Sequence, residues 1–252
     1  LRNVVAGTLV YHIVAGLWCV YIYLIRGKQF FPDAKFPTRE TIADQIYVAQ
    51  TAVFSYSLLP SFASFCAERG YTMSYFYISE VGWASYVLYT AFYFTLVEIG
   101  IYWMHRKLHT NKFLYNNVHL MHHKYNKADE MSPYASIAFH PLDGILQACP
   151  YVILSFFIPV HYITSLFMFF FTAVWATCIH DGVYAATEPI MGAAYHTAHH
   201  VYYKCNYGQI FTFCDSYWGT LRIPNERKDP SGRPPGSAPS PAPRTTGGGS
   251  RG

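Results

Sequence analysis

Nine of the twelve histidines in this 252-residue chain fall into four spaced groups between positions 105 and 200. The groups are His105 and His109; His119, His122 and His123; His180; and His196, His199 and His200. Residues three and four positions apart lie on one helical face, so each HxxHH triad is expected to point its imidazoles to one place. Neutral imidazole is a good ligand for iron, zinc and copper. The spacing therefore predicts a metal site.

The number of clustered imidazoles predicts two metal ions. One tetrahedral zinc takes four ligands, and nine histidines exceed that need. Imidazole alone does not distinguish iron from zinc. The isolated His12 and His161 are expected to be structural. His140 stands beside the predicted site, before Pro141, and is expected to have a structural or supporting role.

Other catalytic chemistries find no support in the sequence. Outside the Pro/Gly-rich tail it contains no GxSxG, Walker A, GxGxxG or HExxH motif and no Glu-x-x-His pair of the soluble di-iron type. Haem would use two histidines and leave the others unexplained. The six cysteines form no CxxC pair, and we expect no disulfide framework. Three of the four net positive charges lie in 226–252, so the body does not resemble a nucleic-acid-binding surface.

Apolar helices must position these histidines. Hydrophobic residues make up 52% of the chain, aromatic residues 19% and charged residues 13%, which is typical of a membrane protein. Apolar runs cover 4–25, 46–66, 81–104 and 145–179. The last is divided near Pro159 into a hairpin whose first half is short enough to be re-entrant. We expect an all-α integral membrane protein with three to five membrane-inserted helices.

The loop charges predict an orientation. Basic residues gather in 26–45 and 105–127, whereas 67–80 has one. Basic loops mark the cytoplasmic side. His105 and His109 directly follow the third run and are expected to continue its helix into the cytoplasm. The histidine groups would then form a helical metal-binding domain on the cytoplasmic face.

We expect three parts along the chain: membrane helices in 1–80, a catalytic domain in 81–225, and a tail in 226–252. Residues 230–252 contain six proline and six glycine residues, a composition that cannot bury a core and predicts disorder. The first residue is leucine and not methionine, which is compatible with a fragment.

The histidine motifs and their flanks resemble those of the membrane fatty acid hydroxylase / sterol desaturase superfamily. Within it, they resemble the sterol C5-desaturases of the lathosterol oxidase type, closely over roughly 80–224. The segments that carry the likeness are Met104–His109, His119–Asn126, Ser132–Gln147, Ile179–Gly182, Tyr195–His200, Asn206–Gln209 and Asp215–Thr220.

The resemblance implies a di-iron enzyme of the endoplasmic reticulum membrane. It would insert the C5–C6 double bond into a Δ7-sterol, using O2 and electrons from NAD(P)H through cytochrome b5 and its reductase. A saturated C–H bond has no useful acidity, so an oxidised metal centre must drive its cleavage. All nine clustered histidines would be ligands, and activity would depend above all on six of them. These six are His105, His109, His122, His123, His199 and His200.

Three polar residues near the motifs are further candidates. Asp143 and Asp181 could orient imidazole N–H groups, although a helix-capping or turn role fits each aspartate equally well. Many plant members have a histidine where this chain has Tyr184. The resemblance to fungal C5-desaturases, which also have tyrosine there, makes Tyr184 a candidate supporting hydroxyl.

Two other functions stay open. One is a relative in the same superfamily, such as a C4-methylsterol oxidase or a lipid hydroxylase. The other is a membrane metal-binding or transport protein without redox chemistry. Transporters place their ligands near the bilayer midplane on broken helices, whereas these histidines are expected outside the membrane spans.

Overall fold

The computed structural model describes residues 2–31, 36–127, 130–183 and 187–224, which are mostly helical. Tyr184 and the expected tail, 226–252, lie outside the described residues. The helices are α1 (Arg2–Cys19), α2 (Gly27–Phe30), α3 (Arg39–Tyr56), α4 (Leu58–Glu68), α5 (Trp83–Thr110), α6 (Lys112–Leu114), α7 (Pro141–Ser155), α8 (Tyr162–Ile179), α9 (Ala193–Tyr202) and α10 (Phe213–Tyr217). The strands are β1 (Ser74–Tyr75) and β2 (Val160–His161).

Within the described residues, three helical segments are long and apolar enough to cross a membrane: Arg2–Ile25, Trp83–Thr110 and Tyr162–Ile179. The first of these is α1 extended by a π-helical turn, and the others are α5 and α8. At 1.5 Å per residue, the 28 residues of α5 extend about 42 Å. A bilayer core is about 30 Å thick, so α5 exceeds the core by about two turns. The all-α membrane fold is confirmed.

The expected hairpin is present as α7 and α8, which β2 separates. Helix α7 begins with Pro141, which has no N–H and suits the first helical position, while His140 caps the helix by accepting from the amide of Leu142. Pro150 inside α7 leaves the carbonyl of Leu146 without its helical donor. The thiol of Cys149 donates to that carbonyl instead. With 15 residues, or about 22 Å, α7 is too short to span the bilayer core.

The apolar run at 46–66 was expected to cross the membrane as one segment. In the structure it is divided between two helices. Helix α3 ends at Tyr56, and α4 begins at Leu58 with Pro60 in its first turn. Proline lacks the N–H that would continue the α3 hydrogen-bond ladder. Helix α3 also begins outside the apolar run, at Arg39 in a polar segment. The apolar run therefore supplies the second half of α3 and most of α4.

Helices α5, α7 and α8 enclose the main apolar core. Tyr93, Val97 and Ile101 of α5 pack with Tyr151 of α7 and Phe169 of α8. Helices α5 and α7 approach closely at Gly100, where a Cβ atom would lie 2.8 Å from Cβ of Pro150. A larger residue at this position would therefore push the two helices apart.

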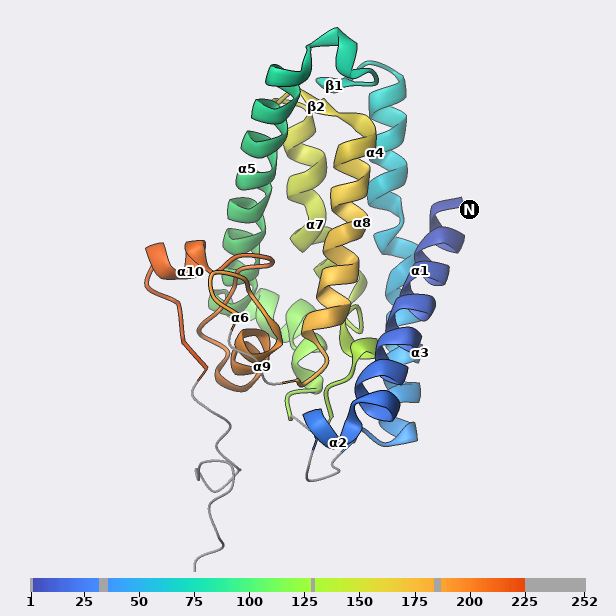
Figure 1. Cartoon of the computed structure of the whole chain (residues 1–252), viewed down its shortest axis with the longest axis vertical. Helices are drawn as coiled ribbons and strands as arrows, with labels where there is room; N and C mark the ends of the chain where they lie inside the picture. Colours follow the sequence, from blue (N-terminus) through green and yellow to red (C-terminus); the bar gives the residue numbers. More distant parts are fainter. Residues whose placement is uncertain (1, 32–35, 128–129, 184–186, 225–252) are drawn as a thin grey trace, which may run out of the picture.

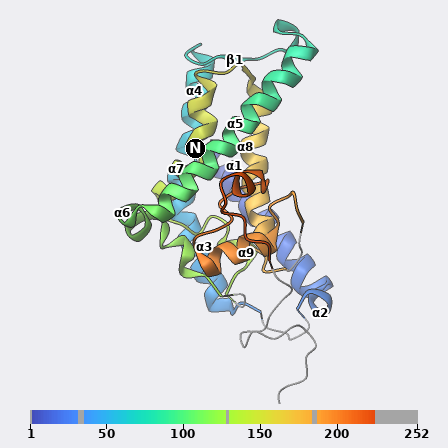
Figure 2. The same cartoon turned by 90° about the vertical axis from the view of Figure 1, so that its left-hand side faces the viewer.

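The two ends of the bundle have different contents. At one end, β1 and β2 form a short parallel pair, with Ser74 opposite Val160 and Tyr75 opposite His161. Figures 1 and 2 show this pair at the top of the bundle and α9 at the opposite end, beside the lower parts of α5 and α8. The predicted hairpin thus brings the chain back to the end that carries the histidine motifs.

Candidate metal centre

Helix α5 supplies the first histidine pair from its last turns. His105 and His109 are four residues apart and therefore lie on one face of the helix. His105 is buried, and His109 is partly buried. The expectation that the HxxxH pair continues the third apolar helix is confirmed.

The HxxHH triad of His119, His122 and His123 does not form a single α-helix. His119 ends a π-helical turn, and His122 and His123 lie in a following 3₁₀ turn. Consecutive residues of a helix point in directions about 100° apart. His123 therefore turns toward His119, whereas His122 turns toward another cluster.

The other HxxHH triad lies on α9, and its side chains are likewise divided between the two clusters. His199 points toward the cluster of His119 and His123, whereas His196 and His200 point away to the other cluster. The prediction that each HxxHH triad converges on one place is thus wrong. Each triad lies between two clusters and contributes to both, because a helical face that holds three imidazoles is wide enough to border two sites.

All nine clustered histidines meet in two groups. The first, the five-histidine group, is His105, His109, His119, His123 and His199. The second, the four-histidine group, is His122, His180, His196 and His200. Within each group the facing ring nitrogens lie within 4.8 Å of one another. One group of potential ligands would therefore be available for each of two ions.

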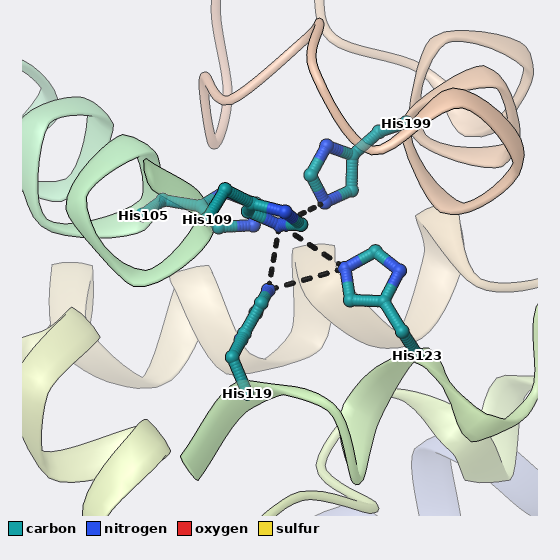
Figure 3. Close-up of side chains that lie close together, drawn as sticks. All are labelled: His105, His109, His119, His123 and His199. Atoms are coloured by element: carbon teal, nitrogen blue, oxygen red, sulfur yellow. Dashed lines mark hydrogen bonds between the residues drawn. The ribbon is translucent and has the colours of Figure 1, made fainter. Parts of the chain in front are cut away.

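In the five-histidine group the Nε2 atoms converge (Figure 3). His109 is central: its Nε2 lies 2.8 Å from that of His119, 3.1 Å from that of His123 and 3.2 Å from that of His199. His105 enters from the same helix as His109, and its buried Nε2 has no hydrogen-bond partner among the described residues. Three polypeptide segments build this arrangement: the end of α5, the turns that carry His119 and His123, and α9.

The four-histidine group is arranged in the same way. His180 follows directly after α8, and its Nε2 lies 3.3 Å from that of His122 and 2.9 Å from that of His196. The Nε2 atoms of His196 and His200 are 3.1 Å apart. All four side chains are buried.

The opposite ring nitrogens show that several of these Nε2 atoms carry no proton. His119 donates from Nδ1 to Oδ2 of Asp143 at 2.7 Å, and His199 donates from Nδ1 to the carbonyl of Cys205 at 2.8 Å. A neutral imidazole has one N–H, so Nε2 of both rings is a bare lone pair. Nε2 of His109 lies next to Nε2 of His119 and Nε2 of His199. If it carries a proton, it can donate a hydrogen bond to one of these two atoms.

A metal ion fits this donor set. Nitrogen ligands about 2.1 Å from one ion stand about 3.0–3.4 Å apart, close to the observed separations. A cation among the lone pairs would turn their mutual repulsion into ligation. The same reasoning holds at His180, whose Nδ1 donates to the carbonyl of Ala176 and whose Nε2 faces two further imidazoles.

Burial favours the neutral form in six imidazoles outside the membrane-spanning segments by lowering their pKa. It lowers the pKa of His199 to about 3 and that of His180 to about 4. Burial, followed by the neighbouring imidazoles, also holds the pKa of His122, His196 and His200 well below the usual value. Neutral imidazole is the form that binds metals. At pH 7 these rings are therefore ready to act as ligands.

The expected supporting residues differ in outcome. Asp143 is fully buried and contacts His119, and its other oxygen accepts from Nε2 of Gln147 at 2.8 Å. Asp181 contacts no imidazole among the described residues, because its two oxygens accept from Nε1 of Trp18 and from the amide of Val183. His140 caps α7 and belongs to neither group.

The loop that follows α9 was not recognised as part of the site. His105 donates from Nδ1 to the carbonyl of Tyr207 at 3.0 Å. Asp215 holds this part of the loop by accepting from the amides of Tyr207 and Gly208. Every residue has a backbone carbonyl, so the residue type does not reveal which carbonyl accepts from a histidine. The side chain of Asp215, which binds the adjacent amides, was the available indication in the sequence.

Glu98 fixes the next part of the same loop. Its Oε2 accepts from the amides of Ile210 and Phe211, and the residue is buried. The signal in the sequence was a single carboxylate within the apolar run at 81–104, which is expensive to bury without a partner.

His12 and His161 have structural partners, as expected. His12 bonds to Nε2 of Gln50, and His161 caps α8 by accepting from the amide of Thr164. The six cysteines are free. None of these residues belongs to either histidine group.

A largely apolar cavity adjoins both groups, and we call it the His-lined cavity. Ile101, Phe139, Ala148 and Tyr151 contribute to its walls, and His105, His122, His180 and His196 border it. The arrangement can therefore hold an apolar molecule next to two candidate metal positions.

Comparison with known proteins places this geometry in a family. The fatty acid hydroxylase family model matches residues 90–220, which include all nine clustered histidines. The chain is 45% identical to the Δ7-sterol-C5(6)-desaturase of Nicotiana tabacum over 90% of this chain and 83% of that protein. It is also 45% identical to a protein of Arabidopsis thaliana, provisionally named Δ7-sterol-C5(6)-desaturase 2, over 91% of this chain and 82% of that one.

A fungal relative is more distant. The Δ7-sterol 5(6)-desaturase of Leptosphaeria maculans is 38% identical over 82% of this chain and 60% of its own length. No solved structure matches the chain. The family model covers more than half of the chain, and the relatives extend the match into the N-terminal helices. The chain belongs to the fatty acid hydroxylase family.

Proposed function

We propose that this protein is a membrane-bound sterol C5(6)-desaturase that uses two non-haem iron ions and O2. The observation that carries the proposal is the gathering of nine imidazoles into two groups beside an apolar cavity. The names of the plant and fungal relatives support a Δ7-sterol as the substrate. The chain is therefore an oxidoreductase of lipid metabolism.

The reaction removes one hydrogen each from C5 and C6 of the sterol and forms the double bond. With two further electrons and two protons, these hydrogens reduce O2 to two water molecules. Bound iron would supply the oxidising power that cleavage of a saturated C–H bond requires. The protein's own contribution is to hold the ions, orient the sterol and exclude bulk water.

Residues of the two histidine groups and of the His-lined cavity can perform these tasks. The nine imidazoles would hold the ions, and Asp143 keeps Nε2 of His119 free by accepting the proton on Nδ1. The carbonyl of Tyr207 does the same for His105. Ile101 and Phe139 offer the sterol an apolar wall. All of these residues lie in 81–225, which we propose as the catalytic domain, with 1–80 as its membrane-helix partner.

We propose that cytochrome b5, reduced by NAD(P)H through its reductase, supplies the electrons. The distribution of basic loops supports an endoplasmic reticulum membrane protein whose histidine end faces the cytoplasm. A soluble or tethered donor domain could approach this end without entering the bilayer.

The test is turnover in membranes that contain the chain, NADH, cytochrome b5 and its reductase. A Δ7-sterol should be converted to a Δ5,7-diene, whose conjugated double bonds absorb in the ultraviolet. The reaction should need O2, stop with iron chelators and remove deuterium from C5 and C6. His122→Ala and His199→Ala should abolish turnover, while His12→Ala, on the periphery, should retain it.

Other products would identify other functions. A hydroxylated lipid or an oxidised C4-methyl group would indicate another activity of the same family and refute the C5-desaturase assignment. Absence of any lipid oxidation, with two bound irons and working electron delivery, would favour a metal-binding protein without redox chemistry.

A further inference from the structure

A second cavity lies beside the His-lined cavity, on the side of α1. We call it the lateral cavity. Helix α1 contributes Gly7 and Val10, α3 contributes Val53, and α8 contributes Phe170 and Val174. The N-terminal helices thus form one wall of a cavity whose other wall belongs to the hairpin.

The two cavities are neighbours and share part of their walls. Tyr56, Ile137 and Ala173 line both of them. At the junction the ring of Tyr56 stacks on that of Phe169, with centroids 5.3 Å apart and planes inclined by 22°.

The lateral cavity suits hydrocarbon better than a polar ligand. Helices α1 and α8 belong to two of the three membrane-spanning segments, so this cavity lies among segments that face lipid. Polar side chains at its border are already paired within the protein. Ser57 donates to the carbonyl of Asn3, Tyr11 to that of Tyr134, and Thr177 to that of Ala173.

The reaction chemistry assigns a direction to the substrate. In a sterol, C5 and C6 lie near the end that bears the 3-hydroxyl group, and most of the ring system and the whole side chain extend the other way. When C5 and C6 lie beside the histidine groups, the long remainder needs a continuous apolar space on one side. The lateral cavity supplies that space next to the His-lined cavity.

We propose that the lateral cavity binds the sterol's side-chain end while the hydroxyl-bearing end occupies the His-lined cavity. This inference rests on the proposed function. It makes α1, which contributes no histidine to either group, a determinant of substrate length. Gly7 and Val174, on opposite walls, set the width available to the side chain.

The test narrows the lateral cavity from α1. A Cβ atom at Gly7 would lie 3.6 Å from Oγ of Ser57 and 3.8 Å from Cγ1 of Val53, which is ordinary contact. Gly7→Leu should raise KM roughly tenfold to 100-fold for a Δ7-sterol with a full side chain, the scale on which apolar pockets discriminate. A Δ7-sterol without the side chain should be unaffected. Leu9→Phe, at an exposed position of α1, should change neither value.

A second measurement needs no turnover and uses both the parent protein and Gly7→Leu. A sterol with a photoreactive group at the end of its side chain should label peptides that contain 7–10 and 169–174. Unlabelled Δ7-sterol should compete, and the sterol without a side chain should compete with equal strength in Gly7→Leu and in the parent protein. Labelling confined to the outer surfaces of the helices would overturn the proposal.

Different results would refute the placement of the side chain and the proposed function. Equal losses for long and short sterols in Gly7→Leu, with normal turnover in the parent protein, would refute the placement of the side chain. Absence of sterol turnover in the parent protein would refute the proposed function. If the photoreactive sterol then still labelled both walls, the lateral cavity would stand as a sterol site.

Discussion

Replacement of Asp143 should weaken one metal site and spare the other. Asp143 accepts the Nδ1 proton of His119, which belongs to the five-histidine group. Among the described residues, no carboxylate makes such a contact in the four-histidine group. Asp143→Asn keeps the size of the side chain and removes its charge, and Asp143→Leu removes the acceptor as well.

The structure sets the magnitude. Both side chains have an exposed fraction of 0%, and their atoms are 2.7 Å apart. A hydrogen bond to a charged group contributes about 1.5–3 kcal/mol. Loss of such a partner to a ligating histidine weakens metal binding about 10–100-fold, which is about 1.4–2.7 kcal/mol at 1.36 kcal/mol per tenfold. Because the side-chain oxygen of asparagine can still accept a hydrogen bond from His119, we expect about tenfold for Asp143→Asn and about 100-fold for Asp143→Leu.

The assay is metal titration of metal-free protein in detergent, with a competing chelator and either Fe(II) or Zn(II). The parent protein should bind about two ions per chain, as two separate groups of nitrogen ligands predict. In the Asp143 variants one of the two affinities should fall by the stated factor. Asp181→Asn is the matched control, since Asp181 is also buried and next to a histidine in sequence but bonds to Trp18 and Val183.

Two results would refute this reasoning. Unchanged affinities at both sites in Asp143→Leu would show that the contact with His119 does not support metal binding. An equal loss in Asp181→Asn would show that burial of any nearby carboxylate matters, and not contact with an imidazole.

Three other predictions follow from the same contacts. His196→Ala should lower metal content by about one ion, as measured by elemental analysis, because it removes one of four nitrogen ligands, whereas His12→Ala should retain both ions. Glu98→Ala should lower the free energy of unfolding by about 1–3 kcal/mol, since the amides at 210–211 lose a buried acceptor; an unchanged thermal unfolding temperature in detergent would contradict this. A glycosylation acceptor placed in 70–78 should be modified in the endoplasmic reticulum, and one placed after residue 225 should not. The opposite pattern would contradict the proposed orientation.

Local sequence features were sufficient to predict much of the fold. The lengths of the apolar runs indicated the segments that became α1, α5 and α8, and Pro159 marked the break between α7 and α8. The prediction failed at 46–66, where hydropathy was continuous but the helix was not. Hydropathy measures the preference of residues for an apolar environment, and it does not report a break in the backbone hydrogen-bond ladder.

The choice between the two aspartates could not be made from sequence. Asp143 and Asp181 are both close to a histidine motif, and both were equally compatible with a capping role. The difference lies in their surroundings: α7 carries Asp143 against His119, whereas α1 brings Trp18 to Asp181. Each contact joins segments distant in sequence, so no local pattern predicts it.

The sequence by itself determined the chemistry of the site: nine imidazoles at helical spacing, next to apolar segments long enough to cross a membrane. These properties belong to neighbouring residues, and periodicity and hydropathy suffice to recognise them. Only the tertiary structure decided that each HxxHH triad is divided, with His199 in one group and His200 in the other. Adjacent side chains on a helix diverge by about 100°, and which of them share a metal site depends on what the rest of the fold places on either side.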